Sequence, residues 1–147
     1  MKIIVLDTGP LGYVTNPKSS READAAKEWL DQALAKGHTI VVPEIADYEL
    51  RRELLRAKKT AGLSRLDALV ATTRYLPLTT SAMRKAAELW AEARNVGKPT
   101  ASNKALDGDV ILAAQVLIAF GREAIVATTN GEHLSRFARA DVWSNIV

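Results

Sequence analysis

The sequence predicts a single α/β domain with a mostly parallel central sheet. Short runs of Val, Ile and Leu, too short for helices, alternate with longer stretches whose apolar residues recur at helical spacing. The short runs are apolar on both faces, as buried parallel strands are. No repeat, low-complexity tract or linker interrupts the chain, and its 147 residues fit one domain spanning residues 1–147.

A strand, a turn and a helix are expected in the first 37 residues. Residues 3–6 are an unbroken β-branched and leucine run, which is typical of a buried strand. Two glycines and a proline within residues 9–12 predict a turn directly after it. Ser20 is a favourable helix start, so a helix is expected over residues 20–36, and Gly37 ends it.

The next segment repeats this pattern of strand and helix. Residues 38–42 (HTIVV) predict a second buried strand, and Pro43 suits the first position of the following helix, where a missing N–H is harmless. That helix is expected to end at Gly62. Residues 63–74 supply a further helical period.

The second half adds two more strands and two long helices. A short strand is expected at residues 75–78, and then a helix over residues 81–97, capped by Thr79 or Thr80. Residues 97–103 are expected to form a loop.

A nearly all-apolar helix closes the pattern. It is expected over residues 110–121, and a fourth strand follows at residues 124–130. The tail ends with an edge strand near Val142.

The composition is that of a globular protein and excludes several classes. Hydrophobic residues make up 48% and charged residues 25%, so a disordered chain is not expected. The chain has no cysteine, which excludes disulfides, thiolate zinc sites and cysteine nucleophiles and agrees with a cytoplasmic location. No apolar run is long enough for a membrane span, and no signal peptide precedes the first strand. The net charge of +3 permits an anionic partner such as nucleic acid without requiring one.

Acidic and amide side chains recur at one edge of the predicted sheet, the edge where parallel sheets bind ligands. In chain order they are Asp7, Glu44 and Glu49, Asp107 and Asp109, and then Asn130 and Glu132. Most of them follow a strand, whereas Asp107 and Asp109 are expected to open the apolar helix before the fourth strand. Clustered carboxylates repel one another unless a cation lies between them, and oxygen ligands alone suit Mg²⁺ or Mn²⁺. Structural roles are the alternative, because Asp7 also suits an Asx turn and Asp107 and Asp109 also suit a helix start.

The tripeptide Asp7-Thr8-Gly9 also occurs in other chemistries. An aspartic protease uses such a motif, but small proteases of that kind are built almost entirely of strands, whereas this chain alternates strands with helices. A phosphatase with a nucleophilic aspartate requires a second aspartate two residues after the first, and Gly9 stands there. A metal-dependent nuclease is the interpretation that the scattered acids favour.

Four blocks, in this order, resemble the PIN-domain ribonucleases, including the VapC-type toxins of VapBC toxin–antitoxin systems. They are VLDTGPLG (5–12), PEIADYELRREL (43–54), LDGDVILAA (106–114) and IVATTNGEHL (125–134). The resemblance implies a three-layer α/β/α sandwich, RNA hydrolysis that depends on Mg²⁺ or Mn²⁺, and a homodimer inhibited by a small antitoxin protein. It identifies Asp7, Glu49 and Asp109 as catalytic metal ligands and Thr128 or Thr129 as a hydroxyl near Asp7.

The chain departs from the family pattern at a fourth acidic position, where Asn130 stands instead of an aspartate. Either Asn130 binds through its amide oxygen, or Glu132 replaces it, or a second metal is weak or absent. Glu44 and Asp107 are further acids that could complete the cluster. Two alternatives therefore stay open beside a toxin: a solitary PIN-domain nuclease in RNA processing or decay, and a catalytically weak RNA-binding module.

Overall fold

A parallel sheet of five strands forms the centre of the computed structural model, which describes residues 1–96 and 103–146. The strands are β1 (Ile3–Leu6), β2 (Thr39–Pro43), β3 (Arg74–Leu76), β4 (Ala124–Thr128) and β5 (Ala140–Val142). Their order across the sheet is β3-β2-β1-β4-β5, and every neighbouring pair runs parallel. The predicted mostly parallel α/β sheet is confirmed.

The strand order reverses direction at β1. After β1 the chain adds β2 and β3 on one side, and then returns to place β4 and β5 on the other. A crevice opens at such a point because the connections from the two neighbouring strands leave toward opposite faces. The carboxyl ends of β1 and β4 therefore mark where a ligand site is expected.

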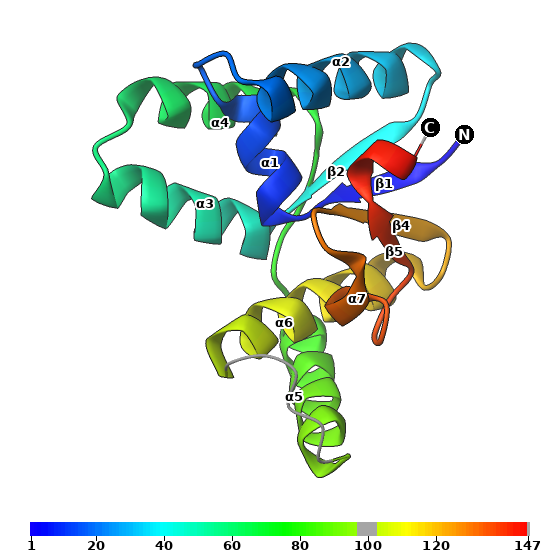
Figure 1. The fold of residues 1–147 in the computed structure, drawn as a ribbon. Helices are drawn as coiled ribbons and strands as arrows, with labels where there is room; N and C mark the ends of the chain where they lie inside the picture. Colours follow the sequence, from blue (N-terminus) through cyan, green and yellow to red (C-terminus); the bar gives the residue numbers. More distant parts are fainter. Residues whose placement is uncertain (97–102, 147) are drawn as a thin grey trace.

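Helices cover both faces of the sheet, as Figure 1 shows, so the three-layer architecture is also confirmed. They are α1 (Thr8–Thr15), α2 (Arg21–Ala35), α3 (Glu44–Arg56), α4 (Thr60–Thr72), α5 (Thr80–Asn95), α6 (Asn103–Phe120) and α7 (Gly131–Leu134), with a 3₁₀ turn at Trp143–Asn145. One layer holds α1, α2 and α4. The other holds α6, and α5 packs on the outside of α6.

Alternating strand residues build two cores, one on each face. On one face Ile4 and Leu6 of β1 pack with Leu11, Trp29 and Leu66 from the helices of the first layer. On the other face, Val5, Val41 and Val126 lie side by side in the strand register and pack against Leu112 and Val116 of α6. Each of these buried side chains contributes about 1.5–3 kcal/mol through removal from water, which fixes the sheet against both layers.

The predicted turn at residues 9–12 is wrong, because the chain forms α1 there. Asp7 caps this helix by accepting from the Thr8 N–H at 2.8 Å. Pro10 lies in the first turn, where backbone N–H groups have no partner within the helix, so the proline is tolerated. Gly9 is needed for a different reason: a Cβ there would lie 2.6 Å from Cγ2 of Thr129.

The helix expected to run to Gly62 ends earlier. The α3 helix stops at Arg56, and Lys58 takes a left-handed conformation with φ 55° before α4 begins at Thr60. Gly62 lies inside α4, where a Cβ would lie 3.0 Å from Cδ2 of Leu54. This glycine therefore allows α4 to approach α3 closely and does not end a helix.

The helix expected at residues 110–121 begins at Asn103, so Asp107 and Asp109 lie within α6 and do not open it. The loop predicted at 97–103 falls mostly on residues 97–102, which lie outside the described residues. The expected edge strand at the end of the chain is found as β5, whereas α7 was not anticipated. In the described part of the chain, no helix is both long and apolar enough to span a membrane.

Candidate active site at the carboxyl ends of β1 and β4

Asp7 is held at the end of β1 by contacts from three directions. Its backbone N–H donates to the Ala127 carbonyl of β4 at 2.9 Å. One carboxylate oxygen accepts from the Thr8 N–H, and the other accepts from Oγ1 of Thr128 at 2.8 Å. Thr128 is only 2% exposed, so this hydroxyl is fixed beside the carboxylate. The hydroxyl predicted near Asp7 is therefore that of Thr128.

Glu49 reaches the same region from α3. Its Oε1 accepts from Oγ1 of Thr8 at 2.9 Å, which joins the second acid to the residue directly after the first. Its Oε2 lies against the backbone of α6, because a Cβ on Gly108 would lie 2.9 Å from it. A larger residue at position 108 would displace this carboxylate from its place against α6.

Asp109 completes the group and shows the clearest electrostatic signature. Burial, and then the negative charges of Asp7 and Glu49, raise the pKa of its carboxyl from the ordinary 3.8 to about 6. The positive charges of His133 and Arg136 oppose this rise in pKa. Burial also raises the pKa of Asp7, although the hydrogen bonds from Thr128 and Thr8 lower it in part. Asp109 is therefore close enough to both other acids to be affected by their charge.

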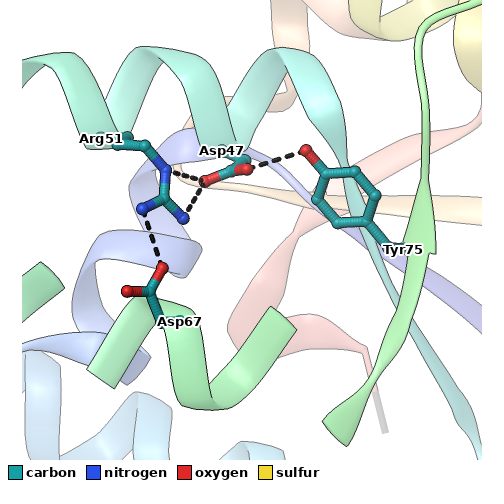
Figure 2. Close-up of polar contacts among 4 residues, drawn as sticks. All are labelled: Asp47, Arg51, Asp67 and Tyr75. Carbon is teal, nitrogen blue, oxygen red and sulfur yellow. Dashed lines mark hydrogen bonds and ion pairs between the residues drawn. The ribbon is translucent and has the colours of Figure 1, made fainter. Parts of the chain in front are cut away.

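A polar network fixes the helix that carries Glu49 (Figure 2). Asp47, only 9% exposed, accepts from Nε of Arg51 at 3.0 Å and from the Tyr75 hydroxyl at 2.8 Å. Arg51 also pairs with Asp67 of α4 at 2.8 Å. Burial and the Asp47 carboxylate raise the pKa of Tyr75, which keeps this hydroxyl a proton donor. The network ties α3 to α4 and to β3.

Two further side chains attach the start of α3 to the segment at β3. Gln115, buried in α6, accepts from the Ile45 N–H at 3.3 Å and donates to the Leu76 carbonyl at 2.9 Å. Glu44 accepts from the Leu78 N–H at 2.7 Å. Gln115 therefore links the two helices that carry Glu49 and Asp109. The Glu44 carboxylate is engaged away from the acid cluster.

The other predicted accessory residues have different surroundings. Asn130 caps α7, since its Oδ1 accepts from the Glu132 N–H at 3.1 Å, and the Glu132 side chain is exposed. Asp107 is exposed on α6 and lies with Glu49 along one hollow of the surface. None of these residues makes a hydrogen bond to the three acids among the described contacts.

Sequence reasoning missed two supports of the site. The Thr8 hydroxyl donates to Glu49, and Gln115, within the stretch predicted as a nearly all-apolar helix, bonds to the start of α3 and to the segment at β3. For Thr8, the pattern that indicates a role in the site is a hydroxyl side chain directly after an acid at the end of a strand. For Gln115, it is a single glutamine within an otherwise apolar helix, because a buried amide must find hydrogen-bond partners.

The carboxylates of Asp7, Glu49 and Asp109 are the candidate ligands of a metal ion. Within residues 1–96 and 103–146, no three carboxylate or imidazole side chains lie in an arrangement that could hold a metal ion as they stand. The chemistry nevertheless fits a hard cation: the donors are all oxygens, Asp109 faces the charges of Asp7 and Glu49, and burial disfavours the charged forms of Asp7 and Asp109. A divalent cation would remove both penalties.

Comparisons with known proteins agree with this architecture. The family model described as PIN domain matches residues 4–140. No curated protein sequence matches the chain.

Three solved structures share the fold. VapBC2 from Rickettsia felis, bound to a DNA fragment from their promoter, is 22% identical with a TM-score of 0.73, covering 96% of this chain and 98% of that one. FitAcB from Neisseria gonorrhoeae is 20% identical with a TM-score of 0.70, covering 98% and 100%. DNA-bound VapBC from Salmonella typhimurium is 19% identical with a TM-score of 0.69, covering 97% and 99%.

Proposed function

The chain belongs to the PIN domain family, a family of nucleases, and on that premise we propose that it is a metal-dependent endoribonuclease and the toxin of a type II toxin–antitoxin pair. The observation that carries the proposal is that Asp109 is partly buried and faces the negative charges of Asp7 and Glu49, so that burial and then these charges raise its pKa to about 6. Structural acids are usually paired with a base or a helix terminus, whereas acids gathered in this way are typical of a cation site. The reaction is the hydrolysis of RNA phosphodiester bonds.

Asp7, Glu49 and Asp109 would hold Mg²⁺ or Mn²⁺. A bound cation of this kind supplies electrostatic stabilisation for a phosphodiester attacked by water. The chain's own residues prepare the site: Thr128 and Thr8 each orient one carboxylate, and Gly108 leaves the space that Glu49 needs. His133 and Arg136 bring positive charge beside Asp109, where it would attract the RNA backbone.

The partners belong to the same proposal. Two of the three similar solved structures are VapBC complexes, and the four sequence blocks resemble VapC-type toxins. Together these likenesses support a small antitoxin protein as inhibitor, a homodimer, and action in the cytoplasm. A reading frame next to the gene that encodes a small DNA-binding protein, and its co-purification with this chain, would test the antitoxin directly.

RNA cleavage by the purified protein tests the nuclease. We expect cleavage of single-stranded RNA with Mg²⁺ or Mn²⁺, none with EDTA, and a loss of about 100-fold or more in Asp7→Asn and Asp109→Asn. Asp31→Asn, which changes an exposed acid of α2, is the matched control and should cleave as the unchanged protein does. Cleavage that persists in EDTA and in both site variants would come from another site or a contaminant and would refute the proposal.

One observation favours a second candidate. Asn130 stands where many family members carry a fourth acid, and its side-chain oxygen caps α7. A PIN-like module that binds RNA and cleaves it weakly would fit that arrangement. RNA binding without cleavage at any metal concentration would select it. RNA cleavage by the purified protein, combined with the absence of a neighbouring reading frame for an antitoxin, would instead select a solitary nuclease of RNA processing or decay.

A further inference from the structure

A hollow of about 320 Å³ lies between α3 and α6, beside the candidate active site. Its lining includes Ile45, Tyr48, Glu49, Arg52, Asp107 and Ile111. The volume is at the lower end of the range of about 300–1,000 Å³ that small-ligand pockets occupy. Because Glu49 also belongs to the acid cluster, anything bound in this hollow would lie next to the proposed point of cleavage.

Tyr48 and Arg52 give the hollow a stacking surface. They lie one turn apart on α3, and the Arg52 guanidinium stands 5.0 Å from the centre of the Tyr48 ring. Tyr48 is 55% exposed, an unusual degree for an aromatic side chain next to a cluster of acids. An aromatic ring combined with an arginine plane is the surface on which proteins stack unpaired nucleobases.

The charges of the hollow favour a base over a phosphate. Glu49 and Asp107 place two carboxylates along it, and Arg52 is already 4.0 Å from Oε2 of Glu49. Carboxylates repel phosphate but accept hydrogen bonds from amino groups, as acidic side chains do from cytosine N4. Ile45 and Ile111 supply apolar wall, which suits the ring of a base.

We propose that this hollow is a base-binding subsite for single-stranded RNA. Tyr48 and Arg52 stack one unpaired base that carries an exocyclic amino group, and the neighbouring carboxylates accept hydrogen bonds from that group. The inference rests on the proposed ribonuclease function and deepens it, because it gives the enzyme a preference for the amino-bearing bases cytosine, adenine and guanine over uracil beside the cleaved bond.

A second copy of the chain is the other occupant to consider. The hollow adjoins a larger one of about 410 Å³ between α5 and α6, and the two share Asp107 and Ile111. Met83 and Trp90 border that larger hollow and are 45% and 36% exposed. A partner helix would cover the Met83 and Trp90 region well. Burying Glu49 and Asp107 against another copy would instead be unfavourable, so the RNA base is the occupant that the Tyr48 hollow favours.

The test measures binding without cleavage. Fluorescently labelled single-stranded hexamers of cytidine and of uridine, which differ at the exocyclic amino group, are titrated in EDTA and followed by fluorescence anisotropy. The unchanged protein should bind the cytidine hexamer more tightly. Tyr48→Ala should weaken that binding by about 5- to 150-fold, the effect of losing one stacked base. Tyr48→Phe, which keeps the ring, should bind within about twofold of the unchanged protein.

Leu55→Ala is the matched control, because Leu55 is 59% exposed on the same helix and lies outside the hollow. Equal affinity for the two hexamers, or Tyr48→Ala binding as tightly as the unchanged protein, would overturn the subsite. So would a Tyr48→Ala variant that loses dimers in sedimentation while its hexamer affinity stays the same. Cytidine binding that depends on Tyr48, without cleavage when Mg²⁺ is added, would support the subsite and refute the nuclease.

Discussion

Replacing Asp109 by asparagine should stabilise the metal-free protein, although it removes a residue of the proposed active site. The carboxyl has a pKa of about 6 in the folded chain and 3.8 as its ordinary value. A difference of one in pKa corresponds to about 1.4 kcal/mol of folding free energy, so the whole difference would cost the folded protein about 3 kcal/mol if the carboxyl were fully buried. Because the side chain is only partly buried, solvent screening reduces this, and we expect a gain of about 1–2 kcal/mol in unfolding free energy at pH 7.5.

The sign of the pH dependence follows from the raised pKa. Between about pH 4 and pH 6 the folded protein holds a proton on Asp109 that the unfolded chain has lost, so the contribution of this group to stability falls as the pH rises through that window. Above pH 6 both states are ionised and the penalty is constant. The difference in stability between Asp109→Asn and the unchanged protein should therefore grow from pH 4 to pH 6 and then level off.

Urea unfolding at several pH values, in EDTA and in Mg²⁺, measures both effects. Magnesium should stabilise only the protein that binds it, by about 2.7 kcal/mol at a concentration 100 times its dissociation constant, so the order of the two stabilities should reverse. Asp31→Asn should follow the unchanged protein throughout. An Asp109→Asn variant that is less stable than the unchanged protein in EDTA at pH 7.5 would show that Asp109 is a structural acid, and the repulsion argument would be wrong.

Three further substitutions test the supports of the site. Thr128→Val should lower the affinity for Mn²⁺ by about 10- to 100-fold in titration calorimetry while Thr128→Ser preserves it, and a valine variant that binds normally would mean the hydroxyl is incidental. Asp47→Ala should lower the unfolding free energy, measured in urea, by about 3 kcal/mol because Asp47 is buried. Asp67→Ala, which removes the exposed acid of the same network, should lower it by less than about 1 kcal/mol. Equal losses in the two variants would contradict the role of burial. Gly9→Ala should lower the melting temperature through a clash costing about 1–3 kcal/mol, whereas Gly12→Ala, whose added carbon would meet nothing closer than 3.7 Å, should preserve or raise it.

The sheet and most helices were predictable because their signals are local. The runs at β1, β2 and β4 are apolar on both faces, and Ser20 and Thr79 are strong caps whose side chains accept from the Ala23 and Ala82 backbones. Strand order was not predictable from these patterns alone, since it depends on which helices pack on which face.

The errors have a common cause, which is that contacts distant in sequence decide the role of a glycine or proline. The segment at 9–12 looks like a turn, yet it belongs to α1, which Asp7 caps, and Gly9 serves the close approach of Thr129. Gly62 looks like a helix end, but it faces Leu54 of the neighbouring helix. No local pattern contains that information.

In the candidate site, too, the acids were predictable from the sequence, whereas the contacts that orient them were not. Asp7, Glu49 and Asp109 could be named from their positions and from the family resemblance, and in the structure the charges of Asp7 and Glu49 act on Asp109. The contacts that orient them, such as the bond from Thr8 to Glu49, join residues 41 positions apart. Such contacts become visible only once the sheet has brought its strand ends together.

Anomalous diffraction from crystals soaked in Mn²⁺ tests the proposed cation site, because it locates the bound ion without any assumption about the substrate. We expect a manganese peak bounded by the carboxylates of Asp7, Glu49 and Asp109, and its loss in crystals of Asp109→Asn. A peak only at other acids, or no peak at a concentration that supports RNA cleavage, would contradict it.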